Sequence, residues 1–373
     1  MRIAYFILNR FDYDSRARLE IETLRSQGYD IEIIATVGGE MKSYLGCPIH
    51  RISQYRWPSK KGRFVQYNLA AASIGRKLKA DIYHAVDLDT LYAAFRASLK
   101  TGGKLVYEAR ELYTELEALT GRRTVRSFWE KLERKLIKKT DTIFTINGSI
   151  ADELVDRYRI ERPEVIRNVA PKVDSLEPID LRFKLKIPAD HRIIIYQGVL
   201  RNGQGLPYLV EVMKRLEKTT LVFFGDGLLK DRLKNQGEDL GISERVKFAG
   251  MIHPDELLNH TAAGDAGVLL MEDVALNNRL ALPQKLFQYL SAGLPQIVSP
   301  MPEIAGFVER EKTGAVLSMN DPDSDAKAIM ELFADSGRFE QIKSNCRYAS
   351  ETNNWEIESK KLIDIYARLG GDL

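Results

Sequence analysis

The strongest constraint on the fold is a regular alternation of short apolar runs with longer amphipathic segments. Arg2–Leu8 and Asp30–Thr36 are typical of buried strands, whereas Ser15–Gln27 has helical spacing of its apolar residues and ends at Gly28. The alternation continues as far as Ser149–Tyr158. Strands that alternate with helices indicate a parallel sheet with helices on both faces, which is a doubly wound α/β domain.

The alternation breaks once and then restarts. Asn168–Pro178 contains two prolines and no periodicity, which is typical of a linker. A new strand is predicted at Arg192–Tyr196, and the pattern then runs almost to the end of the 373 residues. We predict an N-terminal Rossmann-like domain over 1–168, a C-terminal one over 169–350, and a last helix over 351–373 that crosses back to the first domain.

Composition agrees with two globular domains and gives an expectation for the compartment. Hydrophobic residues make up 44% of the chain, but no apolar run approaches the roughly 20 residues that span a bilayer. Cys47 and Cys346 offer neither a disulfide framework nor metal-ligand spacing. The apolar run Ile3–Leu8 is too short for the core of a signal peptide. We therefore expect a cytoplasmic protein that works on membranes, if at all, from the surface of the inner face.

Charge is unevenly distributed between the two halves. Residues 1–170 hold 30 basic and 22 acidic side chains, a net +8, and the rest of the chain holds 25 and 30, a net −5. A basic N-terminal half suggests an anionic partner, such as a membrane surface or a phosphorylated substrate. Scatter over solvated faces is the alternative interpretation. The excess is modest and no binding motif accompanies it, so a nucleic-acid partner is not expected.

A glycine-rich turn opens the second half. The strand that ends at Tyr196–Gln197 is followed by Gly198, Gly203 and Gly205, and then by a helix. Glycines in this position let backbone N–H groups approach a diphosphate at the N-terminus of the helix. The alternative is an ordinary strand-to-helix turn of an α/β fold. A dinucleotide oxidoreductase is not expected, because no G-x-G-x-x-G follows the first strand.

A second helix start lies further along the chain. Pro283 suits the first turn of a helix that runs to Ala292 and stops at Gly293. Lys285 near that N-terminus opposes the helix dipole, which is easier to understand if a phosphate shares the site. The alternative is an exposed surface lysine.

Together the segments resemble the group 1, or family 4, glycosyltransferases of the GT-B fold. Their sequences are most similar to a subgroup linked to bacterial surface polysaccharides. The resemblance rests on the turn at 198–205, FFGDGLLKDRL at 223–233, RVKFAGMIHPDEL at 245–257, KLFQYLSAGLP at 285–295, VYEARELYTEL at 106–116 and IRNV at 166–169. It implies two Rossmann-like domains that face a central cleft. It also implies retaining, metal-independent transfer of a sugar from a nucleotide diphosphate sugar, with no other cofactor. The implied acceptor is a glycan or a lipid-linked saccharide in cell-surface polysaccharide synthesis.

The resemblance assigns the donor site to the second half. The donor-binding residues that it implies are Gly198, Val199, Arg201, Gln204, Gly225, Met251, Pro283, Lys285, Leu286 and Gln288. Four positions depart from the family pattern, because Val199, Gln204, Leu280 and Gln288 stand where charged residues are usual. A non-catalytic GT-B subunit that binds a partner or a glycan is therefore the alternative function.

The first half is expected to hold the acceptor. Asp87, Arg110 and Glu111 follow predicted strands at their carboxyl ends and are the candidate catalytic residues. The candidate acceptor-binding residues are Asn9, Ser15, Arg16 and His84. The alternatives are a helix N-cap at Asp14 or Ser15 and a buried, structural His84.

Two basic segments could contact a membrane surface. The helix predicted over 122–139 is amphipathic, with Phe128 and Trp129 in its apolar stripe. The alternative is a helix packed on the sheet with its basic residues outward. In the segment 56–64, Trp57 and Phe64 alternate with basic residues, which is typical of an interfacial loop.

Overall fold

The computed structural model describes residues 1–52, 60–173 and 175–371, and it divides the chain into two compact units. Unit 1 comprises Met1–Asn168 together with Ile357–Leu373, and unit 2 comprises Val169–Glu356. The second crossing between the units thus lies inside the last helix, α15 (Trp355–Gly371), a few residues after the predicted position. Residues 56–59 of the segment 56–64, with Trp57 among them, lie outside the described residues.

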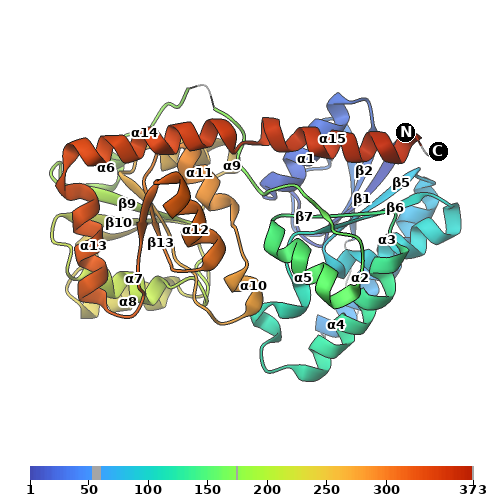
Figure 1. Cartoon of the computed structure of the whole chain (residues 1–373), viewed down its shortest axis with the longest axis horizontal. Coiled ribbons are helices and arrows are strands. Elements are labelled where there is room, and N and C mark those ends of the chain that lie inside the picture. The colour runs from blue at the N-terminus through green and yellow to red at the C-terminus, as the bar shows by residue number, and fades with distance from the viewer. Residues whose placement is uncertain (53–59, 174, 372–373) are drawn as a thin grey trace. The chain divides into compact units, whose positions relative to one another are not determined.

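Unit 1 is built on an eight-stranded sheet with the order β3-β4-β2-β1-β5-β6-β7-β8. Its strands are β1 (Arg2–Phe6), β2 (Asp30–Thr36), β3 (Ser43–Tyr44), β4 (Cys47–Ile52), β5 (Ile82–Val86), β6 (Lys104–Ala109), β7 (Thr142–Thr145) and β8 (Glu164–Val165). All neighbouring pairs are parallel except β3 with β4. Its helices are α1 (Ser15–Ser26), α2 (Lys60–Leu78), α3 (Leu88–Thr101), α4 (Arg123–Leu136), α5 (Gly148–Tyr158) and the greater part of α15 (Figure 1).

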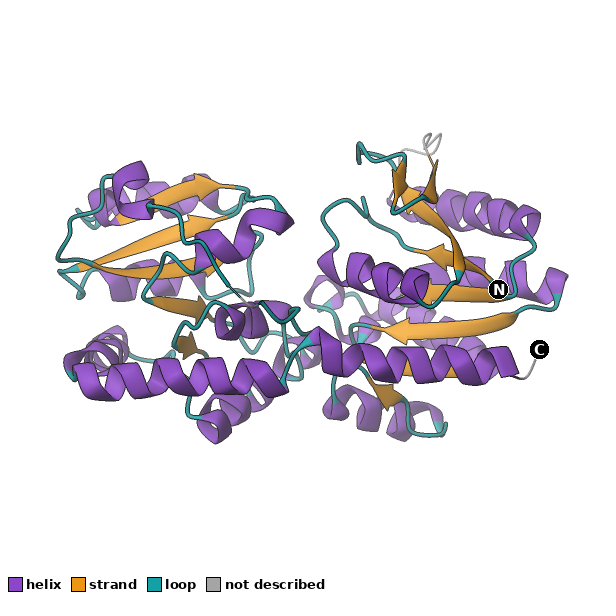
Figure 2. Ribbon diagram, turned by 90° about the horizontal axis from the view of Figure 1, so that it is seen from above, coloured by secondary structure: helices purple, strands orange, loops and turns teal. Residues whose placement is uncertain are grey.

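Unit 2 repeats this design with six parallel strands in the order β11-β10-β9-β12-β13-β14. They are β9 (Arg192–Gln197), β10 (Thr219–Phe224), β11 (Val246–Gly250), β12 (Ala266–Leu269), β13 (Gln296–Val298) and β14 (Gly314–Val316). Its helices are α6 (Leu181–Leu185), α7 (Leu206–Met213), α8 (Lys230–Asp239), α9 (Pro254–Thr261), α10 (Leu276–Arg279), α11 (Gln284–Ser291), α12 (Pro302–Glu311), α13 (Pro322–Ala334) and α14 (Ser336–Thr352). In each unit the helices cover the faces of the sheet (Figure 2).

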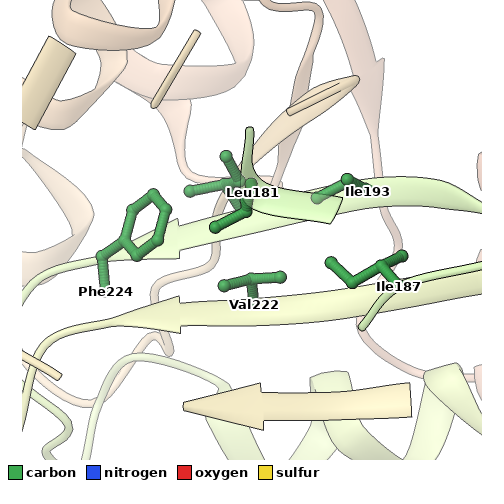
Figure 3. Packing of buried hydrophobic residues seen from close by; sticks show 6 residues of the cluster. Leu181, Ile187, Ile193, Val222 and Phe224 are labelled. Atoms are coloured by element: carbon green, nitrogen blue, oxygen red, sulfur yellow. The ribbon is translucent and has the colours of Figure 1, made fainter. Parts of the chain in front are cut away.

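The central strands are buried on both faces, which is why they appear in the sequence as continuous apolar runs. Every residue of β5 and of β10 is buried, as expected of a parallel sheet covered on both sides. On one face of unit 2, Leu181 and Ile187 pack against Ile193, Val222 and Phe224 of the sheet (Figure 3). These cores hold the carboxyl ends of the strands rigidly at one edge of each sheet.

Helix α4 is packed on unit 1 by its apolar stripe, as the alternative interpretation predicted. Trp129 is 9% exposed and meets Phe64 and Tyr113 edge to face, with ring centroids 4.8 and 4.9 Å away. Leu136 is buried, whereas Phe128 is half exposed. Within the described residues, no helix is both long and apolar enough to cross a membrane.

Candidate functional site

The carboxyl edge of the unit 2 sheet is built from glycines on three neighbouring strands. The N–H of Gly198 donates to the carbonyl of Phe224 over 2.8 Å, and the N–H of Gly225 donates to that of Gly250 over 2.7 Å. Gly225 has a φ of 149°, and a Cβ there would lie 1.9 Å from the Gly198 carbonyl oxygen. Only glycine fits this approach, so the edge is lined by backbone rather than by side chains.

The turn from Gly198 to Gly205 leads directly into α7. Gly205 is the N-cap of this helix, with a φ of 59°. A Cβ on Gly205 would lie 2.8 Å from Leu270 and from Met319, so the turn packs tightly against the body of the unit. The turn therefore places the N-terminus of α7 at the same edge as the other glycines, where N–H groups favour an anion.

Lys285 is the charged side chain at the centre of this edge. It lies in the first turn of α11, after the N-cap Pro283. Its Nζ is 3.0 Å from Oε1 of Gln204 and lies over the Tyr196 ring, 4.5 Å from the centroid. Burial, with a smaller contribution from the nearby Arg201 charge, lowers the pKa of Lys285 to about 7. Across the described residues, Lys285 forms no ion pair with a carboxylate.

Electrostatics gives such a lysine a specific preference. A cation that has lost hydration and has no anionic partner gains strongly from a nearby negative charge. The start of α11 and the glycine turn add backbone dipoles of the same sign. The chemistry that this edge can perform is therefore to hold an anion and to stabilise negative charge that develops on it.

Gln288 lies one turn along α11 from Lys285 and is held in a chain of hydrogen bonds. Thr261 Oγ1 donates to Gln197 Oε1 over 2.7 Å, and Gln197 Nε2 donates to Gln288 Oε1. The Gln288 carbonyl is thus occupied by a protein donor. Its amide group is left to offer N–H donors to a ligand, whereas a carboxylate at the same position would offer acceptors.

Unit 1 places a buried charge network at the corresponding edge of its own sheet. Glu108 is fully buried, and its Oε1 accepts from Arg16 Nε at 2.6 Å and contacts Arg110 Nε at 2.9 Å. Although burial acts in the opposite direction, the Arg110 and Arg16 guanidiniums hold the pKa of Glu108 well below its usual range. Burial and the neighbouring Glu108 charge raise the pKa of Glu20 to about 8. The shift of the Glu20 pKa thus favours its protonated form, whereas that of Glu108 favours its ionised form.

The guanidinium of Arg110 is hydrogen-bonded to other side chains of the protein. Its Nη1 donates to both oxygens of Asp14 at 3.0 Å, and its Nη2 donates to the Tyr5 hydroxyl at 2.8 Å. Only 11% of the side chain is exposed. The predicted catalytic guanidinium is thus directed into the network, and it is the backbone N–H of Arg110 that reaches Asp87 Oδ1, at 2.9 Å.

The carboxyl group of Asp87 lies just after the end of β5. The φ of Asp87, 60°, lies in the left-handed region, which is uncommon for a residue with a side chain, and its N–H donates to the Glu108 carbonyl. Burial, followed by the charges of Glu111 and Asp89, raises the pKa of Asp87 well above its usual value. Burial also raises the pKa of Asp89 to about 7. This edge therefore offers protonatable carboxyl groups rather than free cations.

Comparison with known proteins identifies the family. A family model described as glycosyl transferases group 1 matches residues 179–349, and one described as glycosyltransferase family 4 matches residues 17–170. The chain is a group 1 glycosyltransferase. Its two parallel-sheet Rossmann-like units belong to the GT-B fold.

Relatives and solved structures agree with this assignment. An uncharacterized glycosyltransferase of Methanocaldococcus jannaschii is 23% identical, over 92% of this chain and 91% of that one. The lipopolysaccharide core biosynthesis glycosyltransferase LpsE of Rhizobium meliloti is 25% identical, over 62% of this chain and 64% of that one. The Anabaena protein HepE, solved in complex with UDP-glucose, superposes with a TM-score of 0.79 at 15% identity, covering 99% of this chain and 100% of that chain.

Most predicted donor residues of this glycosyltransferase lie at the unit 2 edge. Val199 and Met251 are exposed there, and Gln204 is buried against Lys285. Leu286 differs from the prediction, because its side chain is 0% exposed and lies in the core. It faces the sheet because apolar residues on α11 alternate with Lys285 and Gln288 at helical spacing.

Two predicted acceptor residues are also buried. Arg16 is 3% exposed and forms its ion pair with Glu108, and His84 is 0% exposed between Glu108 and Tyr366. Both belong to the network and offer no surface to an acceptor, because a buried charge in unit 1 must be matched by buried partners. Asn9 is exposed and donates to Asp14, which is the N-cap of α1, and Ser15 is the first residue of that helix.

Sequence reasoning missed four residues that shape these sites. Tyr196 lies against Lys285, Gln197 orients Gln288, and Tyr366 of α15 hydrogen-bonds His84. Glu20 lies four residues after Arg16 on one helix, and this spacing was a usable signal for the pair. The other three contacts join residues that are 89, 91 and 282 positions apart in the chain, which no local pattern predicts.

Within the described residues, Glu20, His84 and Glu108 form a group whose spacing would suit a metal ion. The guanidiniums of Arg16 and Arg110 already contact both carboxyl groups. Two cations in these positions oppose a third, so the group fits its protein partners better than a metal.

Proposed function

We propose that this enzyme transfers a sugar from a nucleoside diphosphate sugar bound to unit 2 onto a saccharide or lipid-linked acceptor bound by unit 1. The observation that carries the proposal is Lys285. This poorly hydrated lysine forms no ion pair with any carboxylate that the structure describes, and it lies beside a glycine-lined sheet edge. A diphosphate supplies the missing negative charge and can accept from N–H groups at the N-terminus of α7.

The same geometry supports a route for the reaction. The bond between C1 of the sugar and the diphosphate oxygen breaks, and the diphosphate leaves with the electron pair. The acceptor hydroxyl forms the new bond to C1, and its proton passes to the departing phosphate. Lys285 stabilises the leaving charge, and Asp87 and Glu111 bind acceptor hydroxyls. In this proposal the transfer retains the anomeric configuration and uses no metal or other cofactor.

The names of relatives support a place in cell-surface glycan synthesis. LpsE acts in lipopolysaccharide core biosynthesis, and HepE was solved with UDP-glucose. A polysaccharide or glycolipid precursor is accordingly the proposed acceptor class, reached from the inner face of the membrane. A uridine nucleotide is the first donor to test.

Thermal unfolding with UDP, GDP, dTDP, ADP and CMP, each with and without magnesium, tests the donor site. A nucleotide at about 100 times its dissociation constant should stabilise the protein by roughly 2.7 kcal/mol. Lys285→Gln is the matched control and should abolish most of the shift. If no nucleotide shifts the wild-type protein, the donor proposal fails and the non-catalytic alternative replaces it.

Transfer itself needs a second experiment. The stabilising nucleotide, attached to its sugars, is incubated with lipid-linked and free saccharides, and the anomeric configuration of the product is read by NMR. Retention of the donor configuration is the expected result. An inverted product would overturn the proposed route while leaving the donor site intact.

A further inference from the structure

A cavity lies at the edge of the unit 1 sheet opposite the carboxyl ends of its strands. It has a volume of about 550 Å³ and lies between the ends of α2 and α3 and the starts of β5 and β6. The five residues of β5 separate it from Asp87, a distance of roughly 16 Å along the strand. The cavity is therefore separate from the carboxyl edge at which unit 1 is proposed to bind the acceptor.

Three cations line this cavity: Arg76, Lys79 and Lys100. Arg76 Nε donates to the carbonyl of Ala72 in its own helix, over 3.1 Å. In the part of the chain that the structure describes, none of the three forms an ion pair with a carboxylate. Asp81 is the one acidic residue among the residues that line the cavity.

The carboxylates of this edge are engaged elsewhere. Asp81 Oδ2 accepts from the backbone N–H of Arg2 over 2.7 Å. The Arg2 guanidinium pairs with Asp30 at 2.9 Å, and Lys104 pairs with Asp141 at 3.4 Å. Asp30 and Asp141 are thus paired with other cations, whereas Asp81 keeps its charge and is the one lining carboxylate that faces the cations of the cavity.

The negative ends of the helix dipoles balance only part of the positive charge of the three cations. Basic residues often lie at helix C-termini, and each terminus carries roughly half a negative charge. Two helix ends and Asp81 together supply about two negative charges against three cations, which leaves about one positive charge. The cavity is thus net positive even when the common structural role of such residues is counted.

We propose that this cavity binds the phosphate group of a phosphorylated small molecule or of a lipid headgroup. Its volume falls within the range of small-molecule sites. Its three cations form part of the excess of basic residues in the N-terminal half. It is independent of the proposed donor site, which lies in unit 2.

The test compares two triple variants in a Lys285→Gln background, which removes the proposed donor-site lysine. One carries R76Q, K79Q and K100Q, and the other carries K184Q, K186Q and K214Q, an equal charge change on exposed residues of unit 2. Inorganic phosphate binding is measured by titration calorimetry at low ionic strength. Cosedimentation with phosphatidylglycerol vesicles, against phosphatidylcholine vesicles, measures headgroup binding.

The cavity variant should lose about tenfold or more in affinity while the control variant keeps its own. A selective loss with inorganic phosphate supports a soluble ligand, and a selective loss with anionic vesicles alone supports the headgroup. Equal affinities of the two variants in both assays, or no binding of either probe before substitution, would overturn the proposal. Thermal unfolding of each variant verifies that the exposed substitutions leave the fold intact.

Discussion

The two units have the same parallel-sheet design, but the charged side chains at their carboxyl edges have opposite surroundings. In unit 1, Arg16 and Arg110 are buried with Glu108 and Asp14, so that the charges satisfy one another. In unit 2, the described neighbours within hydrogen-bonding distance of Lys285, Gln204 and Tyr196, are both neutral. The charges of unit 1 are thus balanced within the protein, whereas Lys285 of unit 2 is left to interact with an anion.

The difference shows why charged residues at equivalent strand ends do not have equivalent roles. A buried ion network fixes the geometry of the backbone around it, as Arg110 does for Asp87 through its N–H. A desolvated lysine without a counter-ion gains from a charged ligand instead. Substitutions in unit 1 should therefore reduce stability first, whereas substitutions at Lys285 should reduce ligand affinity first.

The largest effect is expected from Glu108→Gln. Removing its charge leaves two buried guanidiniums under-compensated, which should cost about 3–5 kcal/mol of unfolding free energy. Glu20→Gln is the matched control, because the raised pKa of Glu20 favours an uncharged side chain there, and its loss should be within about 1 kcal/mol. Denaturant unfolding measures both. Equal losses would show that the charge in the network is shared rather than held by Glu108.

The next effect concerns unit 2. Lys285→Gln should weaken nucleoside diphosphate binding by about 1.5–3 kcal/mol, the loss of one charge-assisted contact, or roughly 10–150-fold. It should not lower stability, because it removes a desolvated charge. Calorimetric titration and thermal unfolding provide the two readouts. A variant that loses stability but keeps its affinity would reverse the contrast between the units.

The pH dependence of ligand binding is a further test of the contrast between the two units. The pKa of Lys285 is lowered to about 7, so the ligand-free lysine is mostly neutral above that pH. Binding of a diphosphate then requires proton uptake, and affinity should fall by about tenfold per pH unit above pH 7. Without ligand, the stability contribution of Lys285 should rise between pH 7 and its ordinary pKa of 10.5, where only the unfolded chain is protonated.

Lys285→Arg separates this titration from that of the ligand, because arginine remains charged throughout. Its affinity should stay nearly constant with pH once the phosphate is ionised. If the wild-type protein and this variant show the same pH profile, Lys285 is not the titrating group.

The smallest effect is expected from Tyr366→Phe. It removes the hydroxyl that hydrogen-bonds His84 Nδ1 and should cost about 0.5–1.5 kcal/mol of stability. Tyr348→Phe is the control, because Tyr348 is 69% exposed on α14. Nucleotide affinity should be unchanged in both variants. A drop in affinity in Tyr366→Phe alone would mean that the unit 1 network also acts on the donor site.

Some features of the sites could be predicted from local sequence. The glycine turn, the helix start at Pro283 and the position of Lys285 follow from spacing and backbone preference, which are local properties. The burial of His84 and Arg16 could not be derived in this way. Their partners, Tyr366 and Glu108, lie 282 and 92 residues away in the chain.

The sequence by itself determined the alternation of strands and helices, and hence the two parallel sheets, because apolar periodicity acts over a few residues. It also placed the charged residues at strand ends. Only the tertiary structure decided which of those charges are neutralised and which are left for a ligand. Burial and counter-ions depend on side chains that the fold brings together from distant segments, so Arg110 became part of a closed network while Lys285 kept its need for an anion.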